Sequence, residues 1–192
     1  MCGITSGRKE ICLESIGGLK NVFLFSFVPY RKYEISQDGT SLLGFPNTTI
    51  YKYELRADAN TFSTDLEDAE DGQSYNQTAN FTLKGLKSDA QEINALLSKR
   101  IGCIVETRLG HYQIMGLYNG VTVKSVKAST GGNYSDLSGY TINLTAKETN
   151  QPFFIDDLKD VGFDVYDPLA IPSLLQEDGS YLLQENGFKI LL

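Results

Sequence analysis

The last part of the chain, residues 174–192, repeats with a period of eight residues. Two copies carry Leu-Leu-Gln-Glu followed by Asp178-Gly179 and by Asn186-Gly187, and a third copy begins at Ile190. Asp-Gly and Asn-Gly favour the type I′ turn, so each copy predicts a short strand closed by a tight hairpin. The product is a three-stranded meander. Because so small a meander needs a surface to lie on, we expect a docking element, or else a cap on the chain's own sheet.

The composition favours strands over helices. The 192 residues include 18 Gly, 11 Tyr and 10 Phe but no Trp, and a hydrophobic content of 41% is enough for the core of one domain. A net charge of −7 argues against a broad nucleic-acid interface, which would need many Lys and Arg residues. Cys2, Cys12 and Cys103 have no metal-like spacing, so we expect free thiols, although a bridge between the first two is possible.

The chain shows no signal for export or membrane insertion. Its first residues lack a charged region followed by an apolar one, and no apolar run reaches the roughly 18 residues of a membrane span. We therefore expect synthesis in a cytoplasm and no contact with a membrane.

Several segments have the pattern of strands. Val22–Val28 is a continuous apolar run typical of a buried strand, and residues 78–83 alternate polar and apolar side chains. Cys103–Arg108, Tyr112–Leu117 and Val121–Val126 predict a meander with a turn at Gly110 and a hairpin at Asn119-Gly120. Tyr140–Ala146 predicts a closing strand. The fold class expected from these segments is mainly β.

One segment predicts an α-helix, over residues 88–101. Ser88 and Gln91 form a capping box, and Gly102 can take the left-handed conformation that ends a helix. One face of this segment is apolar and consists of Ala90, Ile93, Leu96, Leu97 and Ile101. We expect that face to pack on a sheet.

An acidic stretch lies between Ala57 and Leu83, where the chain has no Lys or Arg. Its acids are Asp58, Asp65, Glu67, Asp68, Glu70 and Asp71. Uncompensated charge opposes local collapse, so we expect an exposed loop or long hairpin tip that becomes ordered on assembly. Phe62, Leu66 and Tyr75 are apolar anchors that a neighbouring subunit could bury.

The chain divides into three parts on this reading. Residues 1–149 form the β domain, residues 150–173 form an irregular arm interrupted by Pro152, Pro168 and Pro172, and residues 174–192 form the meander.

No catalytic, cofactor or metal site is predicted. His111 is the only histidine and lies beside a glycine turn, and Cys103 lies in an apolar run with no base near it in the sequence. The acids from Asp156 to Asp167 do not have the spacing of a calcium loop. The acids at 67–71 have no apolar surroundings that would shift a pKa, so a hydrolase is the weakest alternative.

Residues 86–148 resemble part of the tail-tube-like virion proteins of tailed bacteriophages that infect Bacteroidetes, including crAss-like phages. The resemblance consists of the predicted helix, the strand Ile104–Thr107, the stretch Ile114–Gly120, and Asp136-Leu137-Ser138-Gly139-Tyr140 leading to Leu144. Ser15–Lys20 and the Leu-Leu-Gln-Glu repeats also resemble virion proteins of such phages. The resemblance implies a β-sandwich or barrel with a flanking helix, arranged as a ring around a channel for DNA.

The expected function is that of a non-enzymatic structural subunit of a homo-oligomeric ring or tube in the tail or head–tail connector of a virion. Its partners would be further copies of itself and other virion proteins, and acids in the channel would keep DNA from adhering. The expected contacts between subunits are Phe62, Leu66, Tyr75, Leu174, Leu175, Leu182, Leu183 and Ile190. The alternative is a capsid-decoration or a receptor- or glycan-binding module that uses Tyr118, Tyr134 and Tyr140.

Overall fold

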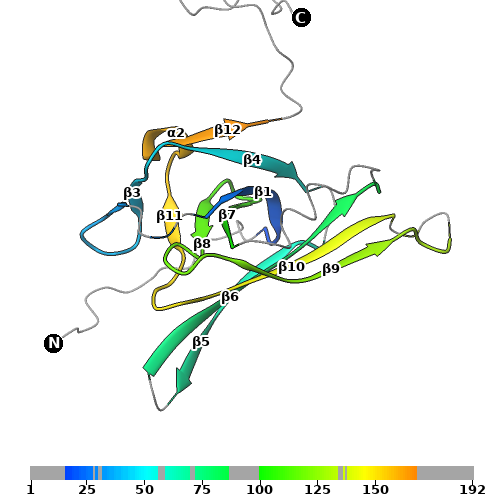
Figure 1. The fold of residues 1–192 in the computed structure, drawn as a ribbon, viewed down its shortest axis with the longest axis horizontal. Helices are drawn as coiled ribbons and strands as arrows, with labels where there is room; N and C mark the ends of the chain where they lie inside the picture. The colour runs from blue at the N-terminus through cyan, green and yellow to red at the C-terminus, as the bar shows by residue number, and fades with distance from the viewer. Residues whose placement is uncertain are drawn as a thin grey trace, which may run out of the picture.

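The protein is mainly β. The computed structural model describes residues 16–27, 29, 32–55, 59–69, 72–86, 100–133, 136 and 138–167. These residues form a curled six-stranded sheet with the shape of a half-barrel, a four-stranded antiparallel sheet, a two-stranded sheet and one short helix (Figure 1). The mainly β class predicted from the sequence is confirmed.

The six-stranded sheet has the order β11-β8-β7-β1-β4-β12. Its strands are β1 (Leu19–Ser26), β4 (Thr48–Glu54), β7 (Ile101–Thr107), β8 (Tyr112–Met115), β11 (Phe153–Ile155) and β12 (Phe163–Tyr166). All neighbours are antiparallel except β12 and β4. The helix α2 (Leu158–Val161) begins after the N-cap Asp157 and ends at Gly162, which adopts the left-handed conformation with φ 110°.

The four-stranded sheet has the order β5-β6-β10-β9, with β5 and β9 at its edges. Its strands are β5 (Thr61–Ala69), β6 (Gly72–Lys84), β9 (Thr122–Ser129) and β10 (Gly139–Glu148), while β2 (Glu34–Ile35) and β3 (Leu42–Gly44) form the small sheet. The β5–β6 hairpin projects beyond the rest of the fold (Figure 1). These two strands therefore extend past the region where the two large sheets pack on each other.

Two apolar cores lie on opposite sides of the six-stranded sheet. Val22 and Leu24 of β1 point into the core shared with the four-stranded sheet. Phe23 and Phe25 point into the second core, inside the curl, with α2 and β12. Because both faces of β1 are buried, this strand requires the continuous apolar run that the sequence shows. The predicted buried strand is confirmed for residues 22–26, since β1 ends at Ser26 and Val28 lies outside the described residues.

The predicted meander is only partly right. Strands β7 and β8 form a hairpin at Gly110, as expected, with the amide of Thr107 donating to the carbonyl of His111 at 2.9 Å. The hairpin at Asn119-Gly120 is wrong, because β8 pairs with β11 while β9 pairs with β10 in the other sheet. The turn carries the chain between layers, and Gly116 and Gly120 have the positive φ values of 67° and 74° that this path requires.

The irregular arm is wrong for residues 153–166. This part of the chain supplies the helix α2 and the strands β11 and β12. The two strands form the two edges of the six-stranded sheet. Its residues Phe153, Ile155, Leu158, Val161 and Phe163 are buried in the second core. Pro152 directly precedes β11 and interrupts no pairing there, while Pro168 and Pro172 lie outside the described residues.

The predicted helix is too long at its C-terminal end, because Ile101 is the first residue of β7 and pairs with Ser26. The rest of that segment, residues 88–99, lies outside the described residues, as does the repeat at 174–192. The acidic stretch is a long hairpin, one of the two predicted forms. A loop is wrong for residues 61–69, since β5 pairs with β6 along its whole length, so these residues are regular in a single chain.

Candidate assembly surface

The surface of the four-stranded sheet that points away from the core carries only polar side chains from Thr61 to Glu67 of β5 and at the positions paired with them on the other three strands. Cross-strand pairing places Ser63, Thr78, Thr145 and Thr122 in one row and Thr61, Asn80, Asn143 and Ser125 in the next. We call these eight residues the polar rows. Neighbouring rows add Asp65, Glu67, Ser74, Asn76, Thr82, Lys84, Lys127, Thr141 and Lys147. No aromatic or aliphatic side chain interrupts this surface over these positions.

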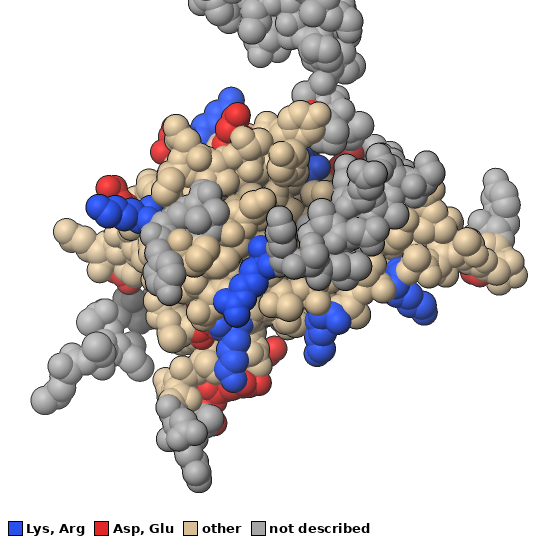
Figure 2. All heavy atoms as spheres, viewed as in Figure 1, with Lys and Arg blue, Asp and Glu red and all other residues tan. Residues whose placement is uncertain are grey.

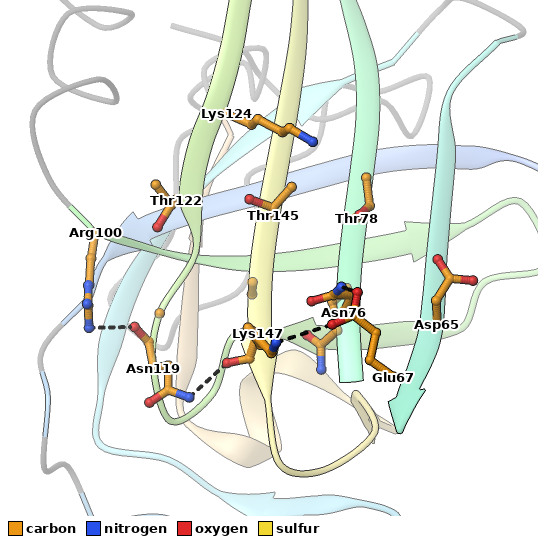
Figure 3. Close-up of a pocket in the computed structure, with 13 residues that line it drawn as sticks. Asp65, Glu67, Asn76, Thr78, Arg100, Asn119, Thr122, Lys124, Thr145 and Lys147 are labelled. Atoms are coloured by element: carbon orange, nitrogen blue, oxygen red, sulfur yellow. Dashed lines mark hydrogen bonds and ion pairs between the residues drawn. The ribbon is translucent and has the colours of Figure 1, made fainter. Parts of the chain in front are cut away.

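A shallow hollow of about 650 Å³ lies over one end of this surface (Figure 3). In it Lys147 forms an ion pair of 3.2 Å with Glu67, which also accepts a hydrogen bond from Asn76. Arg100 donates through Nη1 to the carbonyl of Asn119 at 3.1 Å. Cations and anions therefore lie side by side along the hollow and do not converge on one point, which is not the arrangement of a site for a small charged ligand.

The turn between the two sheets is held by two buried polar side chains. Glu148 Oε1 accepts from the amides of Tyr118 at 3.2 Å and Asn119 at 2.8 Å. Gln77 Oε1 accepts from the amide of Gly116 at 2.9 Å. Glu148 is 3% exposed and Gln77 is 2% exposed. These contacts fix where β9 begins and so place one edge of the four-stranded sheet.

Burial raises the pKa of the Glu148 carboxyl, and the amides of Asn119 and Tyr118 offset this only in part. The folded protein thus holds this proton more tightly than the unfolded chain. The stabilising contribution is complete below the unfolded pKa and is lost as the pH rises through the higher folded pKa. We expect Glu148→Gln to become progressively more stable than the wild type as the pH rises from about 4 to 7, measured by denaturant unfolding.

The matched control for this change is Glu34→Gln, which alters an exposed carboxyl. Its effect measures the general consequence of removing one negative charge and is subtracted from the effect of Glu148→Gln. A Glu148→Gln variant whose advantage shrank with rising pH would contradict the assignment.

The edges of the four-stranded sheet carry opposite charges. Edge strand β5 contains Asp65, Glu67 and Asp68 and no basic residue, while edge strand β9 contains Lys124 and Lys127 and no acid. All five side chains are exposed. Figure 2 shows acids on the β5–β6 hairpin and basic side chains that project below β9, while further basic side chains reach down to the hairpin acids. Neither edge pairs with another strand of the described residues.

The residues predicted to contact other subunits differ in their burial and orientation. Phe62 packs partly on the core of its own chain and is not a free anchor. Leu66 is 53% exposed and lies opposite the half-buried Tyr75 on the hairpin. Asp65 and Glu67 point away from the core, whereas Asp68 alternates to the side of Leu66. Asp58, Glu70, Asp71, Leu174, Leu175, Leu182, Leu183 and Ile190 lie outside the described residues.

The structure also shows the surroundings of Cys103 and of two acids in the stretch from Asp156 to Asp167. Burial raises the pKa of the Cys103 thiol to about 12, so the thiol stays protonated. Asp157 caps α2 and Asp167 pairs with Lys52 at 2.7 Å. Within the described ranges, no group of three or more acids, histidines or cysteines could hold a metal ion, and no helix is long and apolar enough to cross a membrane.

Two buried acids were not predicted from the sequence: Glu148, described above, and Glu106. Glu106 is 4% exposed and accepts from Lys20 Nζ at 2.9 Å and from Asn21 Nδ2 at 2.6 Å. The hydrogen bond to Glu106 raises the pKa of Lys20. Because both oxygens of Glu106 have partners, the group links β1 and β7 and is not free for catalysis. An acid within the apolar run 103–106 was the signal for this buried pair.

The chain matches no protein-family model, no curated protein and no solved structure.

Proposed function

We propose that this protein is a non-enzymatic virion structural subunit that forms a homo-oligomeric ring or tube in the tail or head–tail connector of a bacteriophage. The observation that carries the proposal is the pair of long edges on opposite sides of one four-stranded sheet, neither of which pairs with another described strand. A subunit with a different surface on each side makes head-to-tail contacts, and such contacts generate rings when the rotation closes. The resemblance of residues 86–148 to tail-tube-like proteins supports the phage setting.

The proposed fold is a tail-tube-like β-sandwich in which the two large sheets are the layers. A helix within residues 88–99 and a docking meander at 174–192 remain sequence predictions. In the ring, the polar rows would face the channel. The hydroxyl and carboxamide groups of these rows offer DNA no cations to pair with its phosphates, and Lys147 is already paired with Glu67. The proposed channel surface therefore has neutral polar rows between the acids of β5 and the lysines of β9.

The binding-module alternative has less support. Tyr118 packs edge-on against Tyr33 and Phe153, with ring centroids 5.3 and 6.1 Å apart, and Tyr140 packs on the first core. Both rings are thus half-buried against side chains of their own chain. The third tyrosine of that hypothesis, Tyr134, lies outside the described residues.

Electron microscopy and light scattering of the purified full-length protein test the proposal. We expect closed rings or stacked tubes with one characteristic diameter. A protein that stays monomeric at high concentration and at every salt concentration would overturn it and favour the binding module.

A further inference from the structure

The charges on the two edges of the four-stranded sheet select one way of pairing two copies. Two β5 edges would bring together acids, including Asp65 and Glu67, and two β9 edges would bring together Lys124 and Lys127. Like charges opposite each other destabilise strand pairing, and charges on edge strands are a common means of preventing it. Only the pairing of β9 with β5 joins opposite charges. Symmetric dimers through either edge are thus disfavoured, and head-to-tail growth is favoured.

We infer that β9 of one copy pairs antiparallel with β5 of the next copy, shifted by about four residues so that Leu66 lies opposite Val123. This inference rests on the proposed ring and specifies its contact. Neighbouring strands within the sheet are all antiparallel, so β5 and β9 run in opposite directions. A second copy placed beside the first by rotation therefore continues the antiparallel alternation.

The shift follows from the alternation of side chains. Within one copy, the row that starts at Ser63 ends at Thr122. An unshifted neighbour would place Thr122 opposite Ser63 of the next copy, so only the first residues of each strand would overlap. An odd shift would place core-facing residues opposite outward ones. An even shift is therefore required, and it must be large enough to overlap the edges along their length.

Shifts of four and of six residues overlap the two edges to the same extent, but a shift of six would place the carboxylate of Asp68 opposite Val123, so a shift of about four matches the side chains better. It places Leu66 opposite Val123. Because Lys124 is the extra residue where β9 shifts its pairing with β10, Phe62 then lies opposite Ala128. All four residues are on the core-facing side of their strands. Val123 and Phe62 already pack on the first core of their own chains, so the contact extends that core across the interface. The four-residue shift between copies also sets Lys124 beside Asp65 of the next copy. The 53% exposed Leu66 gains an apolar neighbour.

The same shift has the size that closes a barrel. Four residues of strand rise about 13 Å, and four strands span about 19 Å across the sheet. Their ratio corresponds to a strand tilt of about 35°, at the lower end of the range for closed barrels. The tilt does not depend on the number of copies, so the register constrains the geometry of the ring without choosing its size.

Inter-copy disulfides test the register. In full-length protein with Cys2 and Cys12 replaced by serine, Leu66→Cys with Val123→Cys should give a ladder of covalent oligomers on mild oxidation, because opposite strand residues lie within disulfide reach. Leu66→Cys with Val126→Cys is the matched control, also core-facing but displaced along β9. A stronger ladder from the control pair, or rings without a ladder from either pair, would overturn the inference and leave the ring proposal intact.

Charge reversal tests the head-to-tail pairing. At low salt, Lys124→Glu and Asp65→Lys should each weaken ring formation by about three- to tenfold, and an equal mixture of the two variants should restore it, since opposite edges then match again. Lys32→Glu changes an exposed lysine outside both edges and should have no such effect. Rings unaffected by either edge reversal would overturn the pairing. A wild type that forms no oligomer would overturn both the pairing and the proposed function.

Discussion

Replacing Phe163 by alanine should lower the free energy of unfolding by about 3–5 kcal/mol. This ring is 1% exposed. It stacks on Phe45 with centroids 4.8 Å apart and contacts Phe25 at 5.7 Å. Truncation would leave a cavity inside the curl of the six-stranded sheet and loosen β12 from β4. Denaturant unfolding monitored by circular dichroism would measure the loss.

Phe154→Ala is the matched control, because this phenylalanine lies in the same part of the chain but is 43% exposed. It should change the free energy of unfolding much less than Phe163→Ala does. A loss below about 1 kcal/mol for Phe163→Ala would instead be typical of a surface position. That result would restore the irregular arm expected from the sequence and contradict the position of β12.

Replacing Gly102 by alanine should destabilise the protein by about 2–3 kcal/mol. A Cβ atom at this position would lie 2.1 Å from the ring of Phe25 on the neighbouring strand. To make room, Phe25 would have to leave its contacts with Phe45 and Phe163. The urea midpoint of unfolding should fall accordingly, with an unchanged slope.

Two further variants separate this clash from a general intolerance of alanine. Gly17→Ala has open space around the new Cβ and should be nearly neutral. Phe25→Ala removes the ring that clashes, so the double variant Gly102→Ala/Phe25→Ala should be more stable than the sum of the single effects predicts. Additive losses would show that the ring does not limit the space at Gly102.

Secondary structure could be predicted from the sequence wherever the pattern of apolar residues fits one kind of element. Residues 22–28 predicted a strand buried on both faces, since only such a strand needs consecutive apolar side chains. Alternation in residues 78–83 predicted the polar outward surface, and the same alternation through Ile142, Leu144 and Ala146 also implies that Glu148 points inward. The acidic residues between 57 and 83 left a loop and a hairpin open, and only the pairing of β5 with β6 decided between them.

The tertiary structure alone decided which strands are neighbours. The Asn119-Gly120 sequence suits a hairpin, but buried Glu148 and Gln77 bind the turn and direct β9 to the other sheet. Local turn chemistry could not predict this path, because both partners are distant in the sequence. Likewise β12 pairs with β4 from the far end of the described chain, and a short strand gives too weak a local pattern to predict.

The opposite charges on the two edges of the four-stranded sheet follow the same division. The sequence supplies acids at 65–68 and lysines at 124 and 127, but more than fifty residues separate them in the chain. Only the strand order β5-β6-β10-β9 makes them the outer strands of one sheet. The physical reason is that pairing across a sheet depends on long-range packing, whereas side-chain alternation depends on neighbours within one strand.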